Sequence, residues 1–397
     1  MILNKNQEAF FALVRAGLWE KDVHLLPYGE MDYEEIMRLA EEQSVVGLIT
    51  AGLEHVTDVK VPQEWLLQFI GQTLQIEEQN KDMNDFVAML IEKLRKANIY
   101  AILVKGQGIA QCYERPLWRA SGDVDLYLSD SNYQLAKEYL PSLASHVDNE
   151  EKNLLHLGMT IDSWIVELHG TMYGEVSKRM NRGLDEVHQS IYNGGNVRSW
   201  DNNDVTVFLP SADNDVIIVF THFLQHFFIE GVGLRQICDW CRLLWRYRSE
   251  LDVRLLEQRL RRMGLMSEWK VFYHLATKYL GMPDEVSRLT DVESATPRPN
   301  SNKFGSSHGS IADFKFQDSG PSSSNRRLDK KAEKVLKRIL KSGNFGHNND
   351  LSYRSKYTGI RYKIVAMWRR LTDFASLVPV FPMDAPKFFM SYLIRKV

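Results

Sequence analysis

Apolar positions recur with helical spacing over the first quarter of the chain. The segment "DYEEIMRLAEEQSVVGLITAGL" repeats apolar residues three or four positions apart, which is the pattern of a helix with one buried face. Asp32 stands directly before it, as an N-cap residue would. A longer amphipathic segment, "QEWLLQFIGQTLQIEEQNKDMNDFVAMLIEKLRKAN", follows Pro62, a residue type favoured where helices begin. We therefore predict a helical region over residues 1–98.

The pattern changes after this region, where short apolar runs predict β-strands. The runs "IYAILV" (99–104) and "DVDLYLS" (123–129) are rich in apolar and β-branched residues. The segment "LLHLGMTIDSWIVELHG" (154–170) holds two alternating runs around a short polar turn, as a hairpin does. One further strand is expected in "DVTVFLP" (204–210). With helices predicted after the first two strands, residues 99–210 form a small α/β unit.

Helical spacing returns at Ser211 and continues over residues 211–290. Four amphipathic segments carry it: "SADNDVIIVFTHFLQHFF", "LRQICDWCRLLWRYR", "DVRLLEQRLRRMG" and "SEWKVFYHLATKYLG". The predicted fold class is therefore α+β, with a small mixed β-sheet flanked by N-terminal and C-terminal helical regions. The second helical region would complete a cleft on the sheet.

The last hundred residues divide into a polar stretch and a basic one. Residues 291–325 are rich in Ser, Asn, Gly and Pro and predict a disordered linker, because they bury too little apolar surface to offset ordering entropy. Residues 326–397 hold three cationic segments that predict a basic helical C-terminal region. It could dock on nucleic acid or on an acidic membrane. A solvated charged face is commoner, and we favour it over either partner.

Composition narrows the class of protein and its compartment. The 397 residues suffice for two or three domains, and the net charge of −2 gives no global attraction to nucleic acid or anionic membrane. Three cysteines argue against a disulfide scaffold and fit a reducing compartment. Neither a signal peptide nor a transmembrane segment is recognisable. We expect a cytoplasmic protein.

Two carboxylates lie within the apolar run of the second strand. Side chains alternate along a strand, so Asp123 and Asp125 share one face, about 7 Å apart. Paired negative charges cannot lie in a dry core without compensation, and a divalent cation with oxygen ligands supplies it. An edge strand with solvated carboxylates is the competing explanation, and for an isolated Asp-x-Asp it is the commoner one.

Residues on neighbouring predicted strands favour the metal site. Glu167 and His169 share one face of a hairpin strand, and strand adjacency would place Glu167 beside the Asp pair. Such a cluster can hold one or two metal ions that bridge nucleotide phosphates. Lys105 and Gly106 end the first strand, where a glycine turn admits backbone N–H groups to a phosphate and the lysine adds charge.

Four short motifs follow one another along the chain. They are K-G-x-x-x-A (Lys105, Gly106, Ala110), Y-x-x-P-x-x-R (Tyr113, Pro116, Arg119), D-[IV]-D-L (Asp123, Asp125, Leu126) and E-L-H (Glu167, Leu168, His169). In this order they resemble the uncharacterised bacterial nucleotidyltransferase family of the DNA polymerase β-like superfamily. The resemblance covers about residues 30–290 and extends to "THFLQHFFIEGVGLRQICDW". The wider superfamily usually has Gly-Ser at the glycine turn, where this chain has Gly106-Gln107.

The resemblance implies a metal-dependent nucleotidyltransferase, which moves a nucleoside monophosphate from an NTP to an acceptor hydroxyl or amine and releases pyrophosphate. The acceptor would be a small molecule, a protein or RNA. The catalytic residues and Mg²⁺ (or Mn²⁺) ligands would be Asp123, Asp125 and Glu167. The nucleotide and phosphate would be bound by Lys105, Gly106, Gln107 and Arg119. Secondary site candidates are His169, His226, Arg235 and Asp239.

Three alternatives stay open. A non-catalytic nucleotide- or partner-binding protein could keep this fold, although a pure binder gains nothing from clustered carboxylates. An RNA-modifying or toxin-type transferase could act through the basic C-terminus. A zinc site is conceivable at His222, His226, Cys238 and Cys241. These four residues lie in apolar helical patterns, so core packing and a polar contact to the cleft are the favoured explanation for them.

Overall fold

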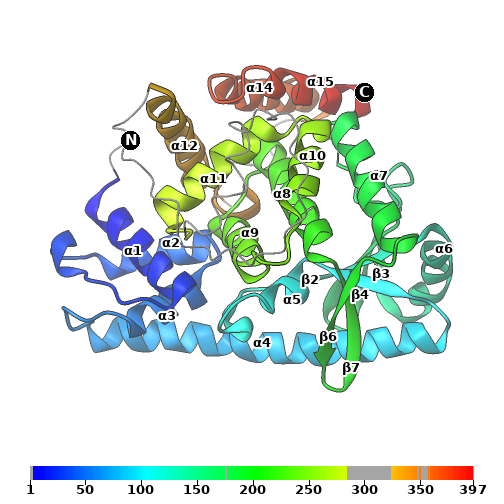
Figure 1. Cartoon of the computed structure of the whole chain (residues 1–397), viewed down its shortest axis with the longest axis horizontal. Helices are drawn as coiled ribbons and strands as arrows, with labels where there is room; N and C mark the ends of the chain where they lie inside the picture. Colours follow the sequence, from blue (N-terminus) through cyan, green and yellow to red (C-terminus); the bar gives the residue numbers. More distant parts are fainter. Residues whose placement is uncertain are drawn as a thin grey trace, which may run out of the picture.

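The N-terminal part of the chain is helical, as predicted. The computed structural model describes residues 3–174, 177–283, 323–346, 348–349, 356 and 358–396. Its first helices are α1 (Lys5–Trp19), α2 (Tyr33–Glu42), α3 (Val46–Glu54) and α4 (Gln63–Lys96). Asp32 caps α2 by accepting a hydrogen bond from the backbone N–H of Glu35 at 3.0 Å. Helix α4 begins after Pro62, spans 34 residues and runs along the lower edge of the molecule in Figure 1.

A five-stranded mixed sheet follows, which confirms the predicted α+β class. Its strands are β1 (Ala101–Val104), β2 (Asp123–Leu128), β3 (Ala144–Val147), β4 (His156–Ile161) and β5 (Trp164–His169). The order is β1-β2-β5-β4-β3. Strands β2 and β5 are parallel, and the other neighbours are antiparallel. Strand β3 was not predicted, because its "ASHV" sequence lies on an exposed edge and carries no apolar run.

The strand predicted at residues 204–210 exists but does not join this sheet. It is β7 (Val205–Pro210), which pairs with β6 (Val197–Asn202) in a separate two-stranded hairpin. Strand β6 was missed because "VRSWDN" is mostly polar. The Arg95 guanidinium of α4 donates to the carbonyl of Thr206, so the hairpin is fastened to the long helix.

Helices connect the strands and cover the sheet. Helix α5 (Gly106–Ala110) follows β1 and α6 (Asp130–Tyr139) follows β2, as predicted, whereas α7 (Lys178–Tyr192) was not predicted. Apolar residues of α4 and α6 pack with the sheet in one buried cluster that includes Val87, Leu126 and Leu168. The sheet is therefore held between α4 and the helices on its other side.

The predicted second helical region forms four helices. They are α8 (Ala212–Ile229), α9 (Leu234–Arg246), α10 (Val253–Met263) and α11 (Met266–Leu280). Their centre is an aromatic core in which the Trp240 and Trp269 ring centroids lie 4.7 Å apart. Figure 1 shows this group above the sheet, on the side opposite α4.

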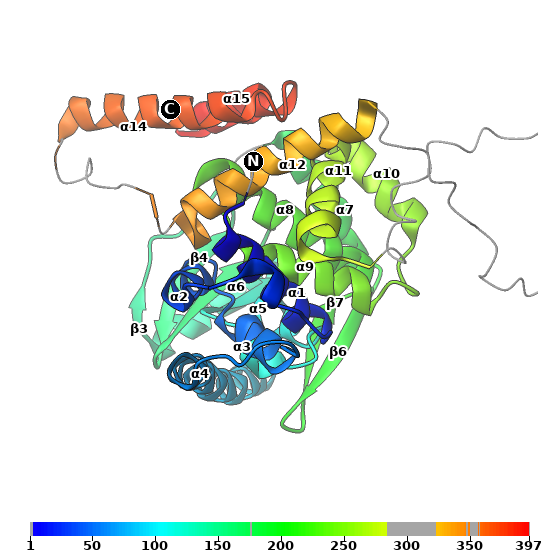
Figure 2. The ribbon, with the colours of Figure 1, turned by 90° about the vertical axis from the view of Figure 1, so that its left-hand side faces the viewer.

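The described residues of the C-terminal part include three long helices: α12 (Ser323–Ser342), α14 (Gly359–Leu377) and α15 (Asp384–Lys396). The predicted linker at 291–325 lies outside the described residues, apart from its last three residues, which belong to α12. Helices α14 and α15 form an outer layer in both Figure 1 and Figure 2. Within the described part of the chain, none of the helices has the length and apolar character needed to cross a bilayer.

Candidate active site

The structure brings the three predicted carboxylates together. Parallel pairing of β2 with β5 sets Asp125 opposite Glu167, and strand alternation places Asp123 on the same face as Asp125. One oxygen from each of these three side chains lies within 4.8 Å of the other two. The expected cluster of Asp123, Asp125 and Glu167 therefore forms at the junction of the two parallel strands.

Asp125 is the buried centre of this cluster. Its side chain is 2% exposed, and its Oδ1 atom lies 2.6 Å from Lys105 Nζ and 2.8 Å from His169 Nε2. Burial acts to lower the pKa of Lys105, but the negative charges of Asp125, Glu167 and Asp123 outweigh it and raise that pKa. The lysine is thus a buried cation that neutralises part of the cluster.

Negative charge remains in excess at Asp123. The charge of Asp125, followed by burial, raises the pKa of Asp123, while Lys105 opposes the shift. A carboxylate whose ionised form is disfavoured by its neighbours gains stability from an added cation. The oxygen donors of this cluster are also the ligand type that Mg²⁺ and Mn²⁺ prefer. The residues present therefore fit a divalent metal ion.

A second group of possible metal ligands shares Glu167, and sequence reasoning missed its third member. His156 lies opposite His169 in the β4–β5 ladder. Both imidazole Nε2 atoms approach Glu167 Oε2, at 3.3 and 3.4 Å. Burial acts to raise the pKa of Glu167, but hydrogen bonds from His156 and His169 and the charge of Lys105 lower it. Counting outward from the two-residue hairpin turn would have paired the histidines.

The turn after β1 aims Lys105 at the cluster. Lys105 has φ 58°, a value rare for a residue other than glycine, and Gly106 follows with φ 38°. A Cβ atom on Gly106 would lie 3.4 Å from the backbone oxygen of Asp123, so the turn passes close to β2. The unusual backbone of Lys105 is held where its ammonium meets Asp125.

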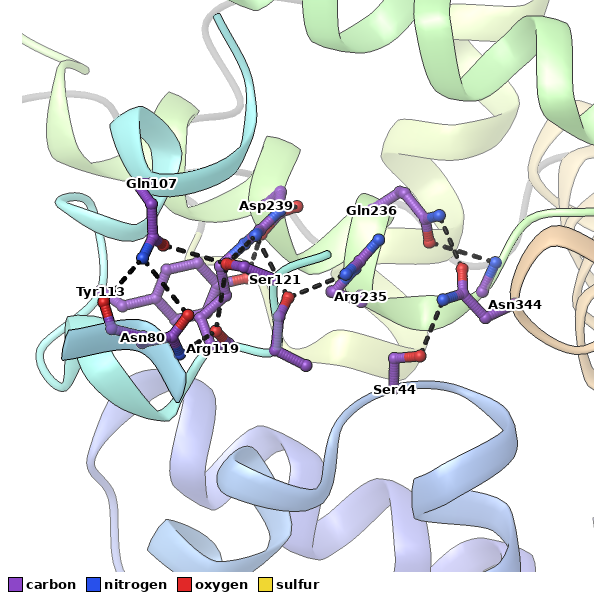
Figure 3. Close-up of polar contacts among 12 residues, drawn as sticks. Ser44, Asn80, Gln107, Tyr113, Arg119, Ser121, Arg235, Gln236, Asp239 and Asn344 are labelled. Carbon is purple, nitrogen blue, oxygen red and sulfur yellow. Dashed lines mark hydrogen bonds and ion pairs between the residues drawn. The ribbon is translucent and has the colours of Figure 1, made fainter. Parts of the chain in front are cut away.

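Gln107 does not line the pocket beside the Asp pair. Its side chain is buried, and its amide nitrogen donates to Asn84 Oδ1 at 2.9 Å and to the Asn80 carbonyl at 3.2 Å, both on α4. Its amide oxygen accepts from the Ser121 hydroxyl at 2.9 Å. Figure 3 shows the contacts of Gln107 with Asn80 and Ser121. The side chain predicted to bind phosphate thus ties the turn to α4 and to the loop before β2.

Arg119 is engaged by Asp239. The two side chains form a bidentate pair, with Nε to Oδ1 at 3.0 Å and Nη2 to Oδ2 at 2.7 Å, and each is 6% exposed. The Tyr113 hydroxyl donates to the same Asp239 Oδ1 at 2.8 Å. Arg235 donates to the carbonyl of Ala120 at 2.8 Å. These contacts, drawn in Figure 3, join the loop before β2 to helix α9.

A pocket with an empty volume of about 440 Å³ opens beside the Asp pair. Lys105, Asp123 and Asp125 line its sheet side, and His222 of α8 and Arg235 of α9 line its helical side. Burial, together with the charge of Lys105, lowers the pKa of His222 well below its usual value, which favours the neutral imidazole. His222 lines the pocket, in line with the expectation that core packing and a polar contact to the cleft are more common for these residues than zinc binding.

The structure does not form the zinc site. Cys238 and Cys241 are buried in the helical core. The His226 ring lies beside His222 and within 3.1 Å of Glu230, and it is not among the pocket-lining residues. Across the ranges that the structure describes, the candidate metal groups are the two that share Glu167, and neither includes these cysteines.

Comparison with known proteins places the site within one matched stretch. A family model described as "Uncharacterised nucleotidyltransferase" matches residues 29–281. That stretch holds every element from α2 to α11, including the carboxylate cluster and the pocket. A search of curated proteins and a search of solved structures each found no match.

Proposed function

Because the chain belongs to the uncharacterised nucleotidyltransferase family, we propose that it transfers a nucleoside monophosphate from an NTP to an acceptor hydroxyl or amine, releasing pyrophosphate. The observation that carries this proposal is the convergence of Asp123, Asp125 and Glu167 beside a pocket that also holds Lys105. A pocket walled by both carboxylates and a cation suits a metal-bound triphosphate better than a neutral ligand.

We assign the metal-ligand role to Asp123, Asp125 and Glu167. When bound there, Mg²⁺ or Mn²⁺ would neutralise charge on the triphosphate and on the departing pyrophosphate. The Nε2 atoms of His156 and His169 lie 3.3 and 3.4 Å from Glu167 Oε2 and help to lower the pKa of Glu167, which favours the ionised form that a metal ligand needs. These two histidines are therefore positioning residues in the proposal.

Lys105 is the proposed phosphate-binding residue. Its ammonium is paired with Asp125 at the edge of the pocket. Once Asp125 has a different cation partner, the same ammonium is available to a phosphate oxygen within the pocket. Gly106 keeps the turn close to β2, so that the lysine lies at the site. Gln107 is assigned the role of holding this turn. Arg119 also lines the pocket, but its guanidinium is engaged by Asp239, so we assign it the role of holding the neighbouring loop.

The proposal is tested by transfer of label from α-³²P-NTP, offering each of the four NTPs with cell extract as the acceptor source. We expect labelled product with wild-type protein and none with Asp123→Ala/Asp125→Ala. The matched control is Asp201→Ala, an exposed aspartate of the separate hairpin, which should label as wild type does. Equal labelling by wild type and the double variant would remove the proposal.

One observation favours a second candidate, a nucleotide-binding protein without catalysis. Lys105 and His169 already compensate Asp125, so the fold needs no metal to tolerate that carboxylate. Thermal unfolding with ATP alone and with ATP plus Mg²⁺ separates the two candidates. A transferase site should be stabilised much more by the combination, whereas a metal-independent binder should respond alike to both.

A further inference from the structure

Helix α14 exposes an apolar stripe. Ile364, Met367, Trp368, Leu371 and Val378 recur three, four or seven positions apart, so they lie along one side of the helix. Ile364 is 62% exposed and Trp368 is 65% exposed. Large apolar side chains of this kind rarely gather on the surface of a protein that has no partner for them.

The C-terminal turns of α14 pack on the core. Phe374 is buried, with its ring 6.0 Å from that of Phe228 on α8. Phe381 follows α14 and packs on the same ring at 5.8 Å. The core therefore uses the C-terminal turns of α14, whereas Ile364 and Trp368, earlier in the helix, are left exposed.

Helix α15 repeats this arrangement. Phe388 is buried and its ring lies 4.8 Å from Phe228. Met383, directly before α15, and Met390 are 66% and 55% exposed. Ile394 is 67% exposed and lines a hollow beside α7. Figures 1 and 2 show α14 and α15 as one outer layer, at the end of the molecule opposite α4. The exposed apolar residues thus belong to one layer, which we call the α14–α15 layer.

The α14–α15 layer is also basic. Residues 359–394 contain five basic residues (Arg361, Lys363, Arg369, Arg370 and Lys387) and two acidic residues (Asp373 and Asp384), although the chain as a whole has a net charge of −2. Arg361, Lys363 and Lys387 are exposed. Apolar residues that include tryptophan, flanked by exposed cations, are the signature of helices that lie in a lipid interface.

We propose that the α14–α15 layer docks on an anionic lipid bilayer. The apolar stripe enters the boundary between headgroups and acyl chains, and the flanking cations bind the negative headgroups. A second copy of the chain fits less well, because a two-fold contact would set the same basic patch against itself. Nucleic acid would pair with the cations but would leave the apolar stripe in water.

The test is flotation of the full chain with phosphatidylcholine vesicles that do or do not contain phosphatidylglycerol. We expect binding to the anionic vesicles only, and weaker binding as salt is raised. The variant Ile364→Glu/Trp368→Glu should bind about tenfold more weakly or worse, because two inserted apolar side chains are lost. Arg361→Glu/Lys363→Glu should also weaken binding, through the headgroup contacts.

The matched control is Leu67→Glu/Leu74→Glu, which changes two exposed leucines of α4 at the far end of the molecule (59% and 55% exposed). It should bind vesicles as wild type does. Melting temperatures should match among all variants, because each changed side chain is exposed. Failure of wild type to float with anionic vesicles, or undiminished binding by Ile364→Glu/Trp368→Glu, overturns the proposal. A wild-type dimer that this variant dissociates overturns it as well, in favour of a second copy.

Discussion

At the scale of single residues, the substitution Asp123→Asn can show whether Asp123 is a metal ligand or a structural aspartate. Because Asp125 and burial raise its pKa, folding stability falls as the pH rises above the usual aspartate pKa, and the full cost is reached above the raised value. Without metal at neutral pH, Asp123→Asn should therefore melt at the same temperature as wild type or higher. The difference should vanish as the pH falls below the usual aspartate pKa.

Added Mg²⁺ should reverse this order of melting temperatures, because it should stabilise wild type more than Asp123→Asn. The variant should also lose label transfer. Thermal unfolding and transfer activity measured on one preparation provide both results. An early-melting Asp123→Asn whose folded fraction is fully active would show that Asp123 is structural.

Lys105 offers a second prediction at this scale. Lys105→Met leaves Asp125 buried and short of its closest cation, which should cost about 3 kcal/mol of unfolding free energy. Mg²⁺ should restore part of that loss, because a divalent ion can replace the missing ammonium. Urea unfolding with and without Mg²⁺, at matched ionic strength, measures the effect. Lys81→Met, at an exposed ion pair on α4, is the control and should show no Mg²⁺ response. Unfolding of Lys105→Met that ignores Mg²⁺ would count against metal binding at Asp125.

Alternation along β2 is a local property, so the sequence predicted that Asp123 and Asp125 share one face. The expectation that the strand of Glu167 lies beside β2 added the third carboxylate. The hydrogen bonds of Gln107 to α4 and of Arg119 to α9 were not foreseen. Both contacts depend on how helices pack over the sheet, which no local pattern records.

At the scale of elements, the Arg119–Asp239 pair joins the loop before β2 to α9. Asp239→Asn keeps the shape but leaves a buried guanidinium without a counter-charge, so we expect a loss of about 3 kcal/mol. Burial acts to lower the pKa of Arg119, and Asp239 outweighs it in the wild type. A guanidinium stays protonated in proteins, so the arginine remains charged when Asp239 is replaced. Chemical denaturation measures the loss.

The control for the Arg119–Asp239 pair is Glu186→Gln, which likewise replaces a carboxylate by an amide, here in the exposed partner of Arg262. Exposed pairs contribute little, so the expected change is below about 1 kcal/mol. Equal effects of the two substitutions would show that the Arg119–Asp239 pair does not fasten the loop to α9.

Elements were predicted where apolar periodicity was strong and missed where it was weak. The buried strands β1 and β2 and the helices α8 to α11 were found from their patterns. Strand β6 alternates between exposed and half-buried positions with mostly polar residues. Strand β6 is stabilised by pairing with β7, and this pairing cannot be predicted from the residue pattern of β6 alone.

At the scale of the whole molecule, the pocket lies between the sheet and helices α8 and α9. Bound ATP with Mg²⁺ should therefore slow amide hydrogen exchange in β2 and in the first turns of α9 together. The α14–α15 layer should be unaffected, because it lies at the outer surface. Hydrogen–deuterium exchange with mass spectrometry measures this. Protection confined to α14 and α15 would place the nucleotide elsewhere.

The spacing of residues along helix α4 affects the geometry of the pocket. Phe69 is buried among the N-terminal helices, Val87 is buried under the sheet, and Asn80 between them holds Gln107. Each residue of an α-helix advances the side-chain direction by about 100°. One residue inserted or deleted between Phe69 and Val87 would rotate the two halves of α4 relative to each other by this angle. Phe69 and Val87 could then not both be buried in their present cores. The number of residues between Phe69 and Val87 is thus constrained by the helical period. Insertions should be tolerated in surface loops but not within this part of α4.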